Sequence, residues 1–140
     1  MTDLSQPIQS DSNDHYIEYY RRSDGIHVFN FLGNRPEGVT EWARHMDVIV
    51  EHSPADGVIL QLMDVQHGVA PLSHMLTEVR GLAARHTVRP GNQIAIIHNS
   101  SMSTALFSAL LPLLPIHNIT IRYFKATEQD AAIGWLLQNN

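Results

Sequence analysis

GVILQLMDVQHG, from Gly57 to Gly68, is the segment around which the other patterns of the chain are arranged. Its first seven residues are apolar apart from Gln61, which is typical of a strand buried on both faces of a parallel sheet. Polar residues follow at once, at Asp64, Gln66 and His67. We therefore expect an α/β domain whose central strand ends in a polar loop.

The residues before this strand predict a hairpin and a helix. Two segments rich in aromatic and β-branched residues, 16–22 and 26–31, are separated by the turn sequence Ser23-Asp24-Gly25. A helix is then expected from Pro36, which suits a first helical turn, to Ser53-Pro54, which ends it. Its apolar residues have the spacing of one helix face: Val39, Trp42, Ala43, Met46, Ile49 and Val50.

The residues after the central strand continue the alternation of helix and strand. A helix is expected from about Pro71, a strand over 93–98, a helix over 101–111 and a strand over 118–124. A final helix is expected at Thr127, with Asp130 completing a sequence similar to a capping box. The predicted order is ββαβαβαβα.

This order predicts a mixed, mostly parallel five-stranded sheet with helices packed on it and an antiparallel hairpin strand at one edge. The chain has 140 residues, which suits one domain with one core. Residues 1–14 are polar and have little to bury, so we expect a flexible tail there and a single domain over 15–140.

Composition excludes several kinds of partner and site. The formal net charge is −5 and basic residues are not clustered, so we expect no nucleic-acid partner. Cysteine is absent, which excludes disulfides and thiolate metal sites. The N-terminus lacks the pattern of a targeting segment, and prolines and polar residues interrupt the uncharged run 99–116. We expect a cytoplasmic protein with no stable membrane insertion.

The segments GVILQLMDVQHG, QIAIIH (93–98) and IRYFKATEQDAAIGWLLQ (121–138) resemble the STAS domain fold, in the branch similar to anti-sigma-factor antagonists (SpoIIAA-like). The resemblance extends over about Tyr16 to Leu137. It implies a binding or regulatory module that is not an enzyme and that associates through a sheet edge or an exposed helix face. In regulatory members a serine that follows an aspartate is phosphorylated at the start of the helix after the central strand. Here the aspartate is missing, and Ser73 is the hydroxyl nearest that position.

Polar residues at two strand ends form the first candidate site. In open α/β sheets, ligands collect at the carboxyl ends of the strands, where helix N-termini offer free amides. A ligand pocket there would use Asp64, His67, His98, Asn99, Ser100 and Ser101. Capping of helices and loops selects the same residue types, and it is the favoured interpretation.

The sequence gives less support to a catalytic site or to a metal site. A serine hydrolase would use Ser101 or Ser103 as nucleophile and His67 or His98 as base, with Asp64 orienting the histidine, but the sequence lacks a Gly-x-Ser-x-Gly elbow. The chain has nine histidines, but none form a His-x-x-x-His pair, so we predict no metal site and no cofactor.

The apolar segment 105–116 is the last candidate site. A helix that is apolar on more than one face is either buried or part of an interface. Core packing, self-association and a slot for a lipid-like ligand all remain open for its leucines, Leu106, Leu110, Leu113 and Leu114.

Our leading hypothesis is a non-catalytic STAS-like interaction or regulatory domain that forms a homodimer and binds a regulatory protein partner. The first alternative is a domain that binds a small apolar ligand or lipid in a pocket at the carboxyl ends of the strands. The second alternative is a small serine hydrolase.

Overall fold

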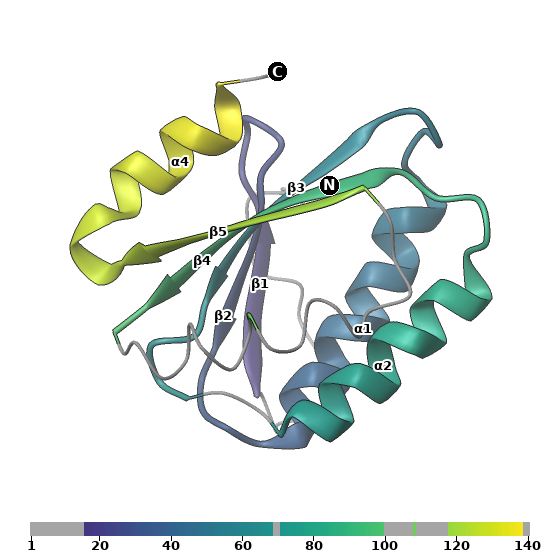
Figure 1. Cartoon of the computed structure of the whole chain (residues 1–140), viewed down its shortest axis with the longest axis horizontal. Coiled ribbons are helices and arrows are strands. Elements are labelled where there is room, and N and C mark those ends of the chain that lie inside the picture. The colour runs from purple at the N-terminus through teal and green to yellow at the C-terminus, as the bar shows by residue number, and fades with distance from the viewer. Residues whose placement is uncertain (1–15, 69–70, 100–107, 109–117, 139–140) are drawn as a thin grey trace, which may run out of the picture.

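The computed structural model describes residues 16–68, 71–99, 108 and 118–138. The tail predicted for residues 1–14 lies outside the described residues, and so does the helix predicted for 101–111 apart from residue 108, which is helical. The elements, labelled as in Figure 1, are β1 (Ile17–Arg21), β2 (His27–Phe31), α1 (Pro36–Glu51), β3 (Val58–Asp64), α2 (Leu72–Arg85), β4 (Gly91–His98), β5 (Ile119–Lys125), the 3₁₀ turn η2 (Ala126–Glu128) and α4 (Gln129–Leu137).

The strands form one five-stranded sheet in the order β1-β2-β3-β4-β5. β1 and β2 are antiparallel, with Ile17 opposite Phe31, and each later pair is parallel. β3 is the central strand, as predicted from its apolar sequence. The predicted mixed α/β fold, with its antiparallel hairpin strand at one edge, is confirmed.

Both faces of the sheet carry a hydrophobic cluster. Figure 1 shows α1 and α2 on one face and α4 on the other. Alternate residues of a strand point to opposite faces, so Phe29 and Met63 pack in the cluster with α1 and α2, whereas Val28 and Leu62 pack in the cluster with α4. Burial on both faces explains why β3 and β4 are almost continuously apolar.

α4 begins differently from the prediction. The backbone N–H of Lys125 donates to Glu128 Oε1 (2.8 Å), and η2 precedes the helix. The capping interaction therefore joins Lys125 and Glu128, and the prediction that used Thr127 and Asp130 was wrong. The physical reason is that the chain leaves β5 through a tight 3₁₀ turn, so the α-helix starts two residues later than Thr127, at Gln129.

Candidate functional site

The polar residues at the ends of β3 and β4 tie the two strand ends together. Asp64 accepts hydrogen bonds from the backbone N–H of Gln66 (2.9 Å) and from its Nε2 (2.9 Å). Asn99 Nδ2 donates to Gln66 O (3.0 Å). Asp64 and Asn99 are thus brought together through Gln66, and their bonds are those expected of loop-stabilising residues.

Of the other predicted pocket residues, the structure describes His67 and His98. His67 is exposed, whereas the half-buried ring of His98 lies edge-on to Tyr123, with ring centroids 6.3 Å apart. Ser100 and Ser101 lie outside the described residues, as does Ser103. The hydrolase geometry, a serine hydroxyl beside an imidazole, therefore involves residues outside the described part of the chain.

Ser73 lies in the first turn of α2 and is exposed. Its carbonyl oxygen accepts a bond from Thr77 Oγ1 (3.0 Å) one turn later. An exposed hydroxyl at this place is compatible with phosphorylation, which stays a prediction.

The leucines of the predicted interface, Leu106, Leu110, Leu113 and Leu114, lie outside the described residues. Homodimerisation through them stays a prediction too.

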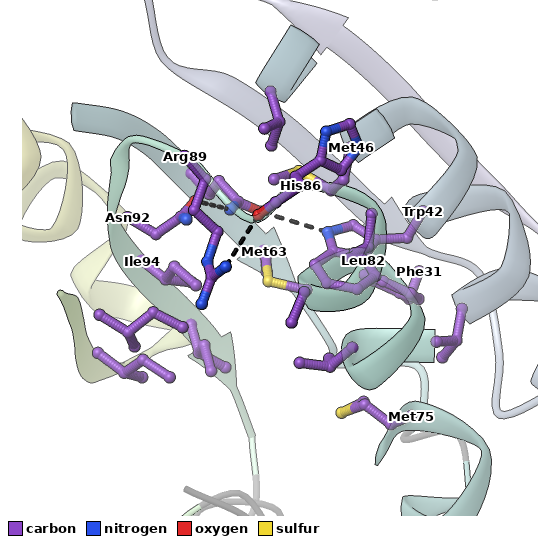
Figure 2. A pocket seen from close by; sticks show the side chains of 18 residues that line it. Phe31, Trp42, Met46, Met63, Met75, Leu82, His86, Arg89, Asn92 and Ile94 are labelled. Atoms are coloured by element: carbon purple, nitrogen blue, oxygen red, sulfur yellow. Dashed lines mark hydrogen bonds between the residues drawn. The ribbon is translucent and has the colours of Figure 1, made fainter. Parts of the chain in front are cut away.

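A cavity of about 90 Å³ lies between α1, α2 and the sheet. Figure 2 shows its lining from close by. α1 contributes Val39, Trp42, Met46 and Val50, and α2 contributes Met75, Val79, Leu82 and Ala83, with His86 just beyond its end. These spacings, mostly of three and four residues, place each set on one helix face. Residues whose spacing predicts packing in the core therefore also line the cavity.

The lining is almost wholly apolar, and its polar groups gather in one region. Strands supply Met63, Ile94 and Ile96, and the described polar residues of the lining are Gln61, His86, Arg89 and Asn92. In Figure 2, Arg89 and Asn92 lie on one side of the cavity, and Phe31 and Met75 lie on the other. Nearly all of the surface that faces the cavity is therefore apolar.

Trp42, Gln61 and Asn92 form a chain of hydrogen bonds along the cavity wall. Trp42 Nε1 donates to Gln61 Oε1 (3.2 Å), and Gln61 Nε2 donates to Asn92 Oδ1 (2.7 Å). Gln61 is only 1% exposed, although it lies in the middle of the most apolar strand. A buried amide needs partners because burial without them costs free energy, and Trp42 and Asn92 supply them.

A charged cluster joins the C-terminal halves of α1 and α2 beside the cavity. Asp47 accepts two bonds from Arg85, Nε at 2.9 Å and Nη2 at 3.0 Å, and lies 2.7 Å from His86 Nε2. Desolvation opposes ionisation of Asp47, but the hydrogen bonds of Arg85 and His86 outweigh it and lower the pKa of the carboxyl. Arg89 Nη1 donates to His86 O (2.8 Å), which holds the guanidinium at the cavity.

An aromatic cluster of titratable groups lies beneath α1, near β1 and β2. Tyr19 Oη lies 2.7 Å from His27 Nδ1, and the Tyr19 and His45 ring centroids are 4.5 Å apart. Burial, assisted by the charge of Arg21, lowers the pKa of His27 to about 4. Burial, assisted by Arg44, also lowers the pKa of His45. These histidines are therefore neutral near pH 7, as suits a packed region.

The polar residues of the cavity were not singled out as functional from the sequence. Trp42 and Met46 were predicted only as part of the apolar face of a helix. One signal for the site is present in the sequence. A lone glutamine inside GVILQLM has to find a hydrogen-bond partner if the strand is buried on both faces.

The described ranges contain neither a metal-binding cluster nor a membrane-spanning helix. No group of three or more His, Cys, Asp or Glu residues in them is arranged to hold a metal ion. No helix in the same ranges combines the length and the apolar character needed to cross a membrane.

Neither a protein-family model nor a curated protein matches this sequence. Among solved structures, the chain is similar to an uncharacterised protein of the DUF3478 family with a SpoIIAA-like fold, from Shewanella loihica PV-4. The TM-score is 0.61 at 17% sequence identity, over 91% of this chain and 99% of that chain. The structural similarity establishes the fold, but at this low sequence identity it leaves the function open. The chain has a SpoIIAA-like α/β fold, as the resemblance of its sequence implies.

Proposed function

We propose that this chain is a non-catalytic domain that binds a small, mainly apolar molecule between α1, α2 and the sheet. The observation that carries the proposal is the cavity of about 90 Å³, with walls that are almost wholly apolar. Small-molecule sites typically combine an apolar lining with a few polar groups that fix the orientation of the ligand. The proposed pocket lies beneath the helices and not at the carboxyl ends of the strands.

The size of the cavity supports a ligand over a packing imperfection. Protein interiors are close-packed and leave few voids larger than a water molecule. At roughly 24 cal/mol per Å³, an empty cavity of 90 Å³ costs about 2 kcal/mol of stability. A bound molecule that restores the missing contacts offsets that cost.

Met46, Met63 and Met75 provide a direct test because their side chains line the cavity. The protein is labelled with ¹³C at the methionine methyl groups and titrated with 1-butanol, a small neutral amphiphile. We expect saturable chemical-shift changes at these methyl groups. A titration that leaves them unmoved up to the alcohol concentration at which the protein begins to unfold would contradict the proposal.

Adjacent alanines of α2 provide a matched pair of variants. Ala83 lines the cavity, whereas Ala84 is exposed. Ala83→Leu fills part of the cavity and should weaken 1-butanol binding by at least about tenfold, while Ala84→Leu should leave it unchanged. Equal effects of the two substitutions would place the binding site elsewhere.

A second candidate function is protein interaction regulated by phosphorylation at Ser73. The observation that favours it is the exposed position of Ser73 in the first turn of α2. A phosphate there gains from the helix dipole and from free backbone N–H groups. Mass spectrometry of the protein purified from its own host should then find phosphate at Ser73. Its absence under all growth conditions tested would count against this candidate.

A further inference from the structure

We infer that the ligand is a neutral molecule with a single aromatic ring, which contacts the thioethers of Met46, Met63 and Met75 and the indole of Trp42. This inference rests on the proposed function and adds the chemical class of the ligand. It follows from the kinds of apolar side chain that line the cavity and from the bonds that polar groups of the wall already make.

The first step is that the wall offers little to a polar ligand group. Nearly all of the surface that faces the cavity is apolar. Trp42 Nε1 donates to Gln61 Oε1, and Gln61 Nε2 donates to Asn92 Oδ1, so these polar groups of the wall are bonded to one another. A charged or strongly polar ligand would lose its hydration there without replacement, which costs free energy. The lining therefore favours a neutral, apolar ligand.

The second step is the methionine content of the lining. The chain has five methionines, and all three that lie in the described ranges line this cavity. Met46 comes from α1, Met63 from β3 and Met75 from α2, and each is buried. In the view of Figure 2, Met46 and Met75 lie toward opposite ends of the lining, with Met63 between them. A ligand in the cavity therefore meets polarisable thioethers on several sides.

The third step is the aromatic part of the lining. Trp42 and Phe31 line the cavity, and both are buried. The indole N–H of Trp42 is bound to Gln61, so the carbon atoms of the indole are what it offers to a ligand. Aromatic rings pair in stacked or edge-to-face arrangements, and thioether sulfur makes favourable contacts with aromatic rings. An aliphatic molecule makes neither kind of contact, so this lining favours an aromatic ring.

The fourth step is size. An apolar cavity of about 150 Å³ engineered in another protein takes up benzene. The cavity here measures about 90 Å³, and the rotatable bonds of its methionines allow the walls to adapt to a ligand. A single ring is therefore the largest aromatic group that suits it. Benzene is the probe, and cyclopentane is a saturated ring of nearly the same volume.

The test compares the two rings by ¹³C-methionine methyl NMR with the full chain. Each affinity is divided by the partition coefficient of the probe between hexane and water, which removes the difference in hydration between the probes. One sulfur–aromatic contact is worth about twofold to tenfold in affinity. With several such contacts, the wild type should bind benzene at least about fivefold more tightly than cyclopentane on this corrected scale.

Exchanges of leucine and methionine test the role of sulfur, because the two side chains have similar volumes. Met63→Leu should lower the preference for benzene by at least about twofold, and Leu82→Met, at a lining residue of α2, should raise it. Leu62→Met is the matched control, because Leu62 precedes Met63 on β3 but packs on the opposite face of the sheet, in the cluster with α4. It should retain the preference of the wild type.

Equal corrected affinities of the wild type for the two rings overturn the inference, while ring binding still supports the proposed function. A preference that both Met63→Leu and Leu82→Met leave unchanged has the same meaning, and so does binding of 1-butanol without either ring. Failure of all three probes to bind overturns both the inference and the proposed function. If a variant does not fold, the wild-type comparison decides alone.

Discussion

Tyr19 Oη lies 2.7 Å from His27 Nδ1, across the antiparallel pair β1 and β2. The two rings are stacked, with centroids 5.9 Å apart, and Tyr19 also packs against His45 of α1. The edge of the sheet is therefore joined to the helix layer through neutral imidazoles. Protonation of these rings places positive charge in a partly desolvated cluster.

Stability should fall as the pH is lowered from about 6.5 to about 4, because the pKa of His27 drops from 6.5 to about 4 on folding. Over that range the unfolded chain binds a proton that the folded chain does not, which favours unfolding. Above pH 6.5 both states carry a neutral His27, so the contribution is fully present there. Urea denaturation at a series of pH values measures this dependence.

His27→Gln removes one of the two buried rings with a lowered pKa, so it should reduce the decrease in unfolding free energy over the same pH range, while His45 keeps its own contribution. His67→Gln is the control, since His67 is exposed. The aspartates with lowered pKa values, Asp24 and Asp47, lose their stabilising charge only at still lower pH, because their unfolded pKa is 3.8. Parallel curves for the wild type and His27→Gln would show that His27 does not cause the pH dependence.

Gln61→Met should destabilise the fold by about 1–3 kcal/mol, because it leaves the indole N–H of Trp42 buried without an acceptor. Trp42→Phe should cost more, since it also removes apolar contacts. The double variant should be less destabilised than the sum of the two, as expected for residues that share one bond. Additive losses of unfolding free energy in urea would mean that the Trp42–Gln61 bond contributes nothing measurable.

Leu136→Ala should destabilise the protein by about 2–5 kcal/mol, because Leu136 is 0% exposed in the cluster beneath α4. Ile133→Ala, on the same helix but half-buried, should cost less. Denaturation midpoints of the two variants make the comparison. Equal small losses would indicate that α4 packs loosely on the sheet.

The fold could be predicted because its signals are local. GVILQLM is continuously apolar around Gln61, which indicates a strand covered on both faces, and the apolar spacing in α1 indicates the face that packs on it. Alternating strands and helices then leave few topologies. The first residue of α4 was predicted wrongly because the residue types of a capping box also occur in a 3₁₀ turn.

The cavity could not be predicted because it depends on how α1 crosses β3. The sequence does not say that Trp42 meets Gln61, or that Gln61 reaches Asn92 on the next strand. Residues whose spacing predicts a core also line a cavity when the layers leave space between them. The strand-end residues Asp64 and Asn99 carried a stronger chemical signal, yet their described bonds stay within the loops.

Two glycines should respond in opposite directions to replacement by alanine. Gly68, after β3, has φ +146°, and a Cβ there would lie 3.0 Å from Asn34 N and 3.0 Å from Gly33 C. Both the backbone conformation and the fixed backbone atoms oppose a side chain, so Gly68→Ala should destabilise by more than about 1 kcal/mol. Gly134, inside α4, is different, because a Cβ added there would have nothing within 4 Å. Gly134→Ala should therefore stabilise by roughly 0.5–1 kcal/mol through helix propensity.

Urea denaturation of the two glycine variants and the wild type measures the sign of both changes in unfolding free energy. The two substitutions add the same methyl group. The difference between them therefore reports only what surrounds that group and which backbone conformation it has to adopt. A stabilised Gly68→Ala would mean that the loop after β3 relaxes without cost. A destabilised Gly134→Ala would mean that another surface packs closely on α4 at this position.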